Sequence, residues 1–210
     1  ACFAHAMNGG LRINQDGETK IKGLFAVGES AGGPHGADRL GGGMLTACQV
    51  FGKRAGRAAA QWVKTEKLDD IPRGTLTELQ EELKLFTTIS KNGTITTFEL
   101  KKEIQELSFK YLLLVRNEQG LLEYLSKLED IASRFTSACR IETSQHTWRA
   151  LEIRNLIQVG KIIAQAGLAR KETRGGHYRE DYPQTKAKPE RIIVHQDPEV
   201  KTVIVDSQPS

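Results

Sequence analysis

Residues 24–29, Leu-Phe-Ala-Val-Gly-Glu, and residues 36–45, Gly-Ala-Asp-Arg-Leu-Gly-Gly-Gly-Met-Leu, are the most informative part of this chain. The apolar run predicts a buried strand with an acidic residue, Glu29, at its carboxyl end. The three glycines predict a loop that opens a helix and lets backbone approach a ligand closely. A helix start offers unpaired N–H groups and the positive end of a dipole, which suits a nucleotide-type cofactor. Arg39, two residues before the glycines, is placed to hold a carboxylate with both arms of its guanidinium group.

Short strand signals and a long helix surround this stretch. Residues 11–13 and 24–27 predict two strands, and residues 14–18 between them predict a turn. Apolar residues at helical spacing then predict a helix over 44–63. They are Met44, Ala47, Phe51, Ala55, Ala58 and Trp62. We therefore take residues 1–63 as the first domain.

A polar stretch with a proline and a glycine, residues 64–74, predicts a linker. Four helices are expected beyond it: 75–86, 97–115, 121–137 and 146–168. Thr75 with Glu78, and Thr96 with Glu99, have the spacing of a capping box at two helix starts. One polar face on the last helix is typical of a helix bundle, which we assign to residues 75–185.

The carboxyl-terminal residues, 186–210, differ from the bundle in composition. Two β-branched runs, 191–195 and 201–205, are joined through Asp197-Pro198 and predict a hairpin-like pair. The expected fold class is therefore α+β, with an α/β piece, an antiparallel helical bundle and a short β tail.

Composition excludes several classes of function. The chain has 210 residues, 39% of them hydrophobic and 27% charged, and a net charge of +4. Basic residues form no stripe interleaved with aromatic residues, so nucleic acid is not an expected partner. No apolar run approaches the roughly 20 residues that cross a bilayer, so direct membrane insertion is not expected. Cys2, Cys48 and Cys139 lie far apart, which argues against a metal or iron–sulfur centre in this chain and favours a cytoplasmic location.

Three ordered blocks of sequence resemble the carboxyl-terminal part of the flavoprotein subunit of the succinate dehydrogenase and fumarate reductase family. L-aspartate oxidase is a close relative of that family. The blocks are His5 with Gly9-Gly10, residues 23–52, and residues 151–156 with 174–183. The resemblance implies FAD as the cofactor and identifies residues 1–63 as the carboxyl-terminal part of an FAD-binding domain. It also implies that this chain is a piece of a longer one, because it has no G-x-G-x-x-G loop for the cofactor's pyrophosphate.

The resemblance also implies roles for individual residues. His5 and Arg39 are the expected substrate-binding residues and would hold the two ends of a C4 dicarboxylate. The expected cofactor-binding residues are Ala6, Glu29, Gly43, Met44 and Leu45. Glu29 would contact the ribitol or ribose of FAD, and the N–H groups of the last two would face N1 and the C2 carbonyl of the flavin. Asp38 stands where the family usually has Asn, and its charge could pair with Arg39.

No catalytic residue is expected in this chain, because the family's proton-donating arginine would lie upstream of Ala1. The block 174–183 is expected to be a network of arginine, carboxylate and tyrosine side chains that docks the helical domain onto the flavin domain. His35 is expected to support the glycine loop.

The predicted function is that of an FAD-dependent oxidoreductase that interconverts fumarate and succinate. Alone, the fragment would be inactive. Electrons would come from an iron–sulfur subunit or another donor, and any association with a membrane would be through partner subunits. Two alternatives stay open: an L-aspartate oxidase type of flavoenzyme, and a non-catalytic helical docking module that lacks its flavin half.

Overall fold

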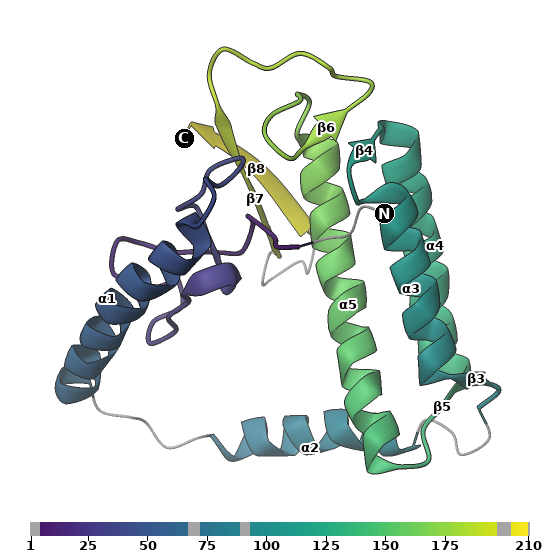
Figure 1. The fold of residues 1–210 in the computed structure, drawn as a ribbon. Coiled ribbons are helices and arrows are strands. Elements are labelled where there is room, and N and C mark those ends of the chain that lie inside the picture. Colours follow the sequence, from purple (N-terminus) through teal and green to yellow (C-terminus); the bar gives the residue numbers. More distant parts are fainter. Residues whose placement is uncertain (1–4, 67–71, 89–92, 197–202, 210) are drawn as a thin grey trace. The chain divides into compact units, whose positions relative to one another are not determined.

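A computed structural model describes residues 5–66, 72–88, 93–196 and 203–209 (Figure 1). The chain divides into two compact units, residues 1–71 and 72–210. The division falls inside the stretch 64–74 that the sequence predicts to be a linker, and residues 67–71 of that stretch lie outside the described residues.

The first unit has few regular elements before its long helix. Strand β1 (Leu11–Arg12) pairs in parallel with β2 (Ala31–Gly32), and a single 3₁₀ turn, η1 (Gly28–Ser30), immediately precedes β2. Helix α1 (Gly43–Thr65) follows the glycine loop. The predicted helix at 44–63 is therefore confirmed and is slightly longer at both ends.

The predicted strand at 24–27 is wrong. Phe25 makes one isolated antiparallel bridge with Glu18, and the N–H of Ala26 donates to the carbonyl of Gly17 at 2.8 Å. The N–H of Thr19 donates to the carbonyl of Leu24 at 2.9 Å, and the N–H of Leu24 donates to Ile21 at 3.0 Å. These hydrogen bonds pair the segment only with residues 17–21 just before it, and the segment does not join the sheet of β1 and β2. The segment is also not fully buried, since Leu24 is 40% exposed.

Helix α1 packs on the turn 14–18 through small residues. Ala55 is buried, and its Cβ would lie 2.8 Å from any Cβ placed on Gly17. Gly17 also has φ of 77°, in the left-handed region that favours glycine. The side chain of Asn14 accepts from the N–H groups of Asp16 and Glu18 and closes the turn, as predicted.

The second unit is a helical bundle with short ladders at its ends. Its helices and strands are α2 (Arg73–Thr88), β3 (Ile95–Thr96), α3 (Thr97–Tyr111), β4 (Val115–Arg116), α4 (Glu118–Ala138), β5 (Cys139–Arg140), α5 (Ser144–Ala169), β6 (Tyr178–Arg179), β7 (Glu190–Gln196) and β8 (Val203–Pro209). Helices α3, α4 and α5 lie side by side and run antiparallel in sequence order (Figure 1). Their shared core includes Leu100, Tyr124, Leu128, Ile131 and Ile153, all fully buried.

Two-stranded parallel ladders join the loops at either end of the bundle. β3 pairs with β5 at one end, and β4 pairs with β6 at the other. β7 and β8 form an antiparallel pair in which Val194 lies opposite Val205. The predicted hairpin-like tail is thus confirmed, although Asp197-Pro198 lies outside the described residues. The α+β fold class is confirmed as well.

Of the two predicted capping boxes, one forms at a helix start and the other does not. Thr96 and Glu99 form a capping box, with Glu99 N–H donating to the Thr96 hydroxyl at 3.2 Å. The Thr75 and Glu78 pair does not cap, because α2 already begins at Arg73 and the N–H of Thr75 donates to the Pro72 carbonyl.

The helix predicted for 97–115 ends earlier, at Tyr111. The Nε–H of Arg116 donates to the carbonyl of Leu112 at 2.8 Å, so this carbonyl has a hydrogen-bond partner without a further helical turn. The chain then enters strand β4.

Candidate functional site

The seven predicted site residues all lie in the first unit, on three segments. His5 and Ala6 are exposed in the amino-terminal segment, and Glu29 is exposed in the 3₁₀ turn η1. Arg39 is half-buried in the loop before α1. Gly43, Met44 and Leu45 form the first turn of α1.

Two carboxylates hold the amino-terminal segment at successive residues. The N–H of Met7 donates to Glu29 Oε1 at 2.7 Å, across 22 positions of sequence. The side-chain amide of Asn8 donates to Asp38 Oδ1 at 3.4 Å, across 30 positions. The structure therefore brings the segment that carries His5 and Ala6 together with Glu29 and with the loop that carries Arg39.

Asp38 does not neutralise its neighbour. Its Oδ1 accepts the backbone N–H of Arg39 at 2.9 Å, and no ion pair joins the two side chains. Within the described part of the chain, the Arg39 guanidinium group has no hydrogen-bonding partner. The expectation that Asp38 could pair with Arg39 is therefore not met, and the guanidinium group is available to a carboxylate ligand.

The start of α1 presents unsatisfied backbone donors. Gly42 is the N-cap, has φ of 77° and supplies no side-chain cap. The N–H of Gly43 donates to the Leu40 carbonyl at 2.9 Å, but the N–H groups of Met44 and Leu45 have no acceptor among the described residues. The first turn of α1 contains no acidic residue, so the positive end of the helix dipole is not offset there.

The backbone around this helix start is open. A Cβ on Gly41 or Gly42 would meet no atom within 4 Å, and one on Gly43 would touch nothing closer than the His35 ring at 4.0 Å. The Nε2 atom of His35 and the Oδ1 atom of Asn8 are buried without a partner among the described residues. Free donors, an open backbone surface and orphaned polar atoms together fit a planar heterocycle with carbonyl oxygens and ring nitrogens, such as a flavin.

Glu29 is placed differently from the prediction. It lies in the 3₁₀ turn and does not end a strand. Its Oε1 is engaged by Met7, and its other oxygen has no partner in the described part of the chain. A carboxylate with one oxygen to spare can still accept a hydrogen bond from a hydroxyl group of a ligand.

The predicted network at 174–183 exists in the second unit. Arg179 is fully buried and forms two hydrogen bonds to the Asp181 carboxylate, each of 2.7 Å. Its guanidinium group also donates to the carbonyls of Gly167 and Arg170, and it lies 5.0 Å from the centre of the Tyr182 ring. The contacts hold the end of α5 to the following loop. Docking onto the flavin domain stays a prediction.

The same network reaches the start of α4. Asp181 Oδ2 accepts the N–H of Glu118 at 2.8 Å, and the Asn117 side chain donates to Glu180 at 3.0 Å. The Arg179 hydrogen bonds lower the pKa of Asp181 to about 2. The cluster is thus a structural clamp across the end of the bundle.

Sequence reasoning missed a pair of basic residues that meet across the bundle. Arg116 Nη1 lies 2.8 Å from His177 Nδ1, although 61 positions separate them. Burial, and next the charge of Arg116, lower the pKa of His177 to about 4. The imidazole is therefore neutral near pH 7, with Nδ1 accepting from the guanidinium group. No local sequence signal marks such a pair.

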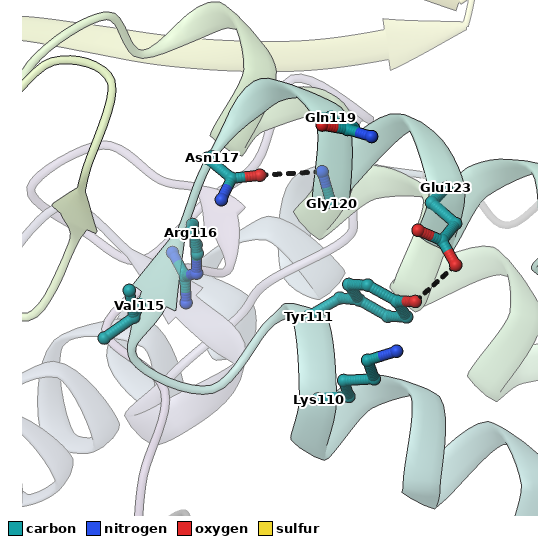
Figure 2. Close-up of a pocket in the computed structure, with 8 residues that line it drawn as sticks. All are labelled: Lys110, Tyr111, Val115, Arg116, Asn117, Gln119, Gly120 and Glu123. Atoms are coloured by element: carbon teal, nitrogen blue, oxygen red, sulfur yellow. Dashed lines mark hydrogen bonds between the residues drawn. The ribbon is translucent and has the colours of Figure 1, made fainter.

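A polar pocket of about 330 Å³ lies next to this pair, at the start of α4. Figure 2 shows Tyr111 directed at Glu123, with Lys110 below the ring. The Tyr111 hydroxyl donates to Glu123 at 2.5 Å, and the Asn117 side chain accepts the N–H of Gly120 at 2.8 Å. Glu123 also pairs with Lys127 at 2.8 Å, and Lys110 lies over the Tyr111 ring at 4.6 Å. None of the predicted site residues lines this pocket.

Metal-binding and membrane-spanning features are both absent from the described residues. These residues contain no cluster of three or more His, Cys, Asp or Glu side chains that could hold a metal ion. None of the helices they form has the length and apolar character needed to cross a membrane. Cys48 and Cys139 are free thiols, and Cys2 lies outside the described residues.

Comparison with known proteins links both units to flavoproteins. Residues 2–45 match a family model described as an FAD binding domain, and residues 101–202 match one described as the carboxyl-terminal part of the fumarate reductase flavoprotein. A solved E. coli quinol fumarate reductase FrdA chain superposes with a TM-score of 0.88 at 26% identity, covering 98% of this chain and 37% of that one.

Curated relatives include two archaeal proteins and one plant protein. An uncharacterised FAD-dependent oxidoreductase of Methanocaldococcus jannaschii is 36% identical, over 87% of this chain and 33% of the relative. One of the subunits of the CoM/CoB fumarate reductase of Methanothermobacter marburgensis is 34% identical, over 91% of this chain and 35% of the relative. The chloroplastic L-aspartate oxidase of Arabidopsis thaliana is 30% identical, over 99% of this chain and 31% of the relative. The chain spans about a third of the length of these relatives.

Proposed function

The chain belongs to the succinate dehydrogenase and fumarate reductase flavoprotein family, and from that premise we propose that it is the carboxyl-terminal part of an FAD-dependent oxidoreductase that interconverts fumarate and succinate. One observation carries the proposal. Hydrogen bonds join the segment of His5 to Glu29 and to the loop of Arg39, and that loop leads directly into the open start of α1.

The start of α1 is the proposed place of the flavin ring. The unpaired N–H groups of Met44 and Leu45 would donate to the edge of the ring that carries N1 and the C2 carbonyl. The dipole of a 23-residue helix would stabilise negative charge at that edge. The second carboxylate oxygen of Glu29 would accept a hydrogen bond from a hydroxyl group of the cofactor. When bound, FAD supplies the hydride-transfer chemistry.

Arg39 and His5 are the proposed substrate ligands. The guanidinium group of Arg39 has a planar pair of donors that matches one carboxylate of a C4 dicarboxylate. His5, exposed on the adjacent segment, would bind the other carboxylate. Fixed positive charge beside the substrate would stabilise the negative charge that develops while the double bond is reduced.

L-aspartate oxidation is the second candidate function. The plant L-aspartate oxidase aligns over nearly the whole chain, and Asp38 keeps one carboxylate oxygen without a partner in the described part of the chain. An amino-acid substrate carries an ammonium group, and a nearby carboxylate would favour it. The 34% identity to one component of a fumarate reductase supports the dicarboxylate as substrate.

We also propose that electrons reach the flavin through a separate iron–sulfur subunit. The Methanothermobacter marburgensis relative is named as one subunit of its enzyme, which supports an assembly of this kind. Any association of this chain with a membrane would then be through partner subunits.

A substrate panel tests the proposal. The full-length flavoprotein is purified with FAD, and oxidation of a reduced viologen dye by fumarate is measured beside oxidation of L-aspartate by oxygen. We expect turnover with fumarate and none with L-aspartate. Turnover of L-aspartate alone would establish the second candidate function, and no turnover of either would refute both.

A further inference from the structure

We propose that Asp38 is a positioning residue that fixes the His5 segment against the Arg39 loop and so sets the spacing of the two substrate ligands. The proposal rests on the proposed function, in which His5 and Arg39 hold the two carboxylates of one substrate. It concerns a residue that would itself touch neither the cofactor nor the reacting atoms.

The contacts of Asp38 span both segments. Its Oδ1 accepts the backbone N–H of Arg39 at 2.9 Å and the side-chain amide of Asn8 at 3.4 Å. One oxygen atom therefore ties the residue that carries the guanidinium group to a residue three positions from His5. Glu29 holds the intervening Met7 N–H at 2.7 Å and is the second anchor of the same segment.

The direction of the Asp38 carboxylate has a functional consequence. A carboxylate that paired with the Arg39 guanidinium group would compete with the substrate for it. Here the carboxylate instead binds the backbone of Arg39, and the guanidinium group stays without a partner among the described residues. Asp38 can thus order the loop while the substrate ligand stays available.

Asp38 is also separate from the packing of the first unit. It is exposed, whereas the buried apolar residues in the described part of that unit are Ala26, Ala31 and Ala55. Removing the Asp38 side chain is therefore expected to leave the unit folded. This separation makes a positioning role testable apart from stability.

The test compares two variants of the full-length flavoprotein. Asp38→Ala removes the acceptor, and Asp38→Asn keeps one acceptor oxygen while it removes the charge. Asp16→Ala is the matched control, because Asp16 is an exposed carboxylate of the same unit whose side chain makes no hydrogen bond within the described part of the chain. The readouts are flavin content, kcat and KM for fumarate, and hydrogen exchange in a peptide covering residues 5–10.

We expect Asp38→Ala, which loses both hydrogen bonds to Oδ1, to raise KM for fumarate about tenfold, with kcat changed much less. Exchange over 5–10 should become faster in that variant and flavin content should stay at the control level. Asp38→Asn should restore both KM and exchange to near wild type. A positioning role is refuted if Asp38→Ala changes neither quantity, or if Asp38→Asn is as impaired as Asp38→Ala.

Failure of the proposed function would look different. A wild-type enzyme that turns over no dicarboxylate refutes the proposed function, and hydrogen exchange then decides the structural part alone. Faster exchange over residues 5–10 in Asp38→Ala, but not in Asp38→Asn, would still support the tie between the two segments. Equal exchange in all variants would overturn it.

Discussion

Replacing Arg179 by Met is expected to destabilise the helical unit strongly. The change keeps a long side chain in a fully buried position and removes the guanidinium group. That group makes two 2.7 Å hydrogen bonds to Asp181 and also donates to the carbonyls of Gly167 and Arg170. Its loss leaves a carboxylate and a buried carbonyl without this donor. Asp181 is exposed, so its carboxylate can be rehydrated, and we expect a loss of unfolding free energy of about 2–3 kcal/mol, the scale of hydrogen bonds to a charged group.

Urea unfolding followed by far-UV circular dichroism measures this loss, since most of the helix lies in the second unit. Lys188→Met is the control, because Lys188 is an exposed cation of the same unit and should change the free energy by less than about 0.5 kcal/mol. A loss below about 1 kcal/mol in the Arg179 variant would refute the role of the cluster as a clamp.

The loss of stability at low pH gives an independent check on the Arg179–Asp181 cluster. The Arg179 hydrogen bonds lower the pKa of Asp181 from 3.8 to about 2, so the ionised carboxylate is favoured in the folded state. This contribution to stability is present above the unfolded pKa and is lost as the pH falls through the folded one. Wild-type protein should therefore lose stability between about pH 4 and pH 2 by this route, and Arg179→Met should lose less over the same interval.

Three further predictions concern the linker, the core and a helix cap. Limited proteolysis of the chain should cut first within 64–74, and first cuts inside the bundle helices would contradict that boundary. Gly160→Ala should destabilise the protein by about 1–3 kcal/mol in urea unfolding, because the added Cβ would overlap the buried Tyr124 hydroxyl, whereas Gly56→Ala meets no atom within 4 Å and should be neutral or stabilising. Thr96→Ala removes the capping box of α3 and should cost about 1 kcal/mol, and an unchanged urea midpoint would show that the box contributes nothing.

The helices could be predicted because their signals are local. The apolar stripe from Met44 to Trp62 repeats at helical spacing and lies on the less exposed side of α1. Thr96 and Glu99 satisfy each other's backbone groups three positions apart. Periodicity and capping depend on neighbours within one or two turns, so the sequence alone contains them.

The wrong predictions of secondary structure arose where hydrogen-bond partners outside the local pattern determine the backbone conformation. The apolar run 24–27 has the composition of a strand, but its backbone hydrogen bonds go to residues 17–21 just before it, and it does not join the sheet of β1 and β2. Leu112 and Leu113 continue the apolar pattern of α3, yet the Arg116 side chain binds their carbonyls and the helix has ended. The capping spacing of Thr75 with Glu78 failed because the helix had begun earlier.

The candidate site divides in the same way. Its residues could be placed from motif resemblance, because the glycine loop and Arg39 are contiguous in sequence. The anchors on Met7 and Asn8 could not, since they link positions 22 and 30 residues apart. Asp38 illustrates the limit most clearly: proximity in sequence suggested a pair with the Arg39 side chain, whereas the carboxylate binds backbone.

The most direct test of the proposed function is the fumarate turnover of Arg39→Lys, measured with flavin occupancy in the full-length flavoprotein. Lysine keeps the positive charge and loses the planar pair of donors that matches a carboxylate. If Arg39 holds the substrate, kcat/KM for fumarate should fall by a factor that corresponds to about 3–4 kcal/mol, with flavin content near that of the wild type. Unchanged turnover would contradict a substrate-binding role and leave Arg39 an ordinary surface residue. Loss of flavin together with turnover would contradict it too, and would assign Arg39 to the cofactor loop.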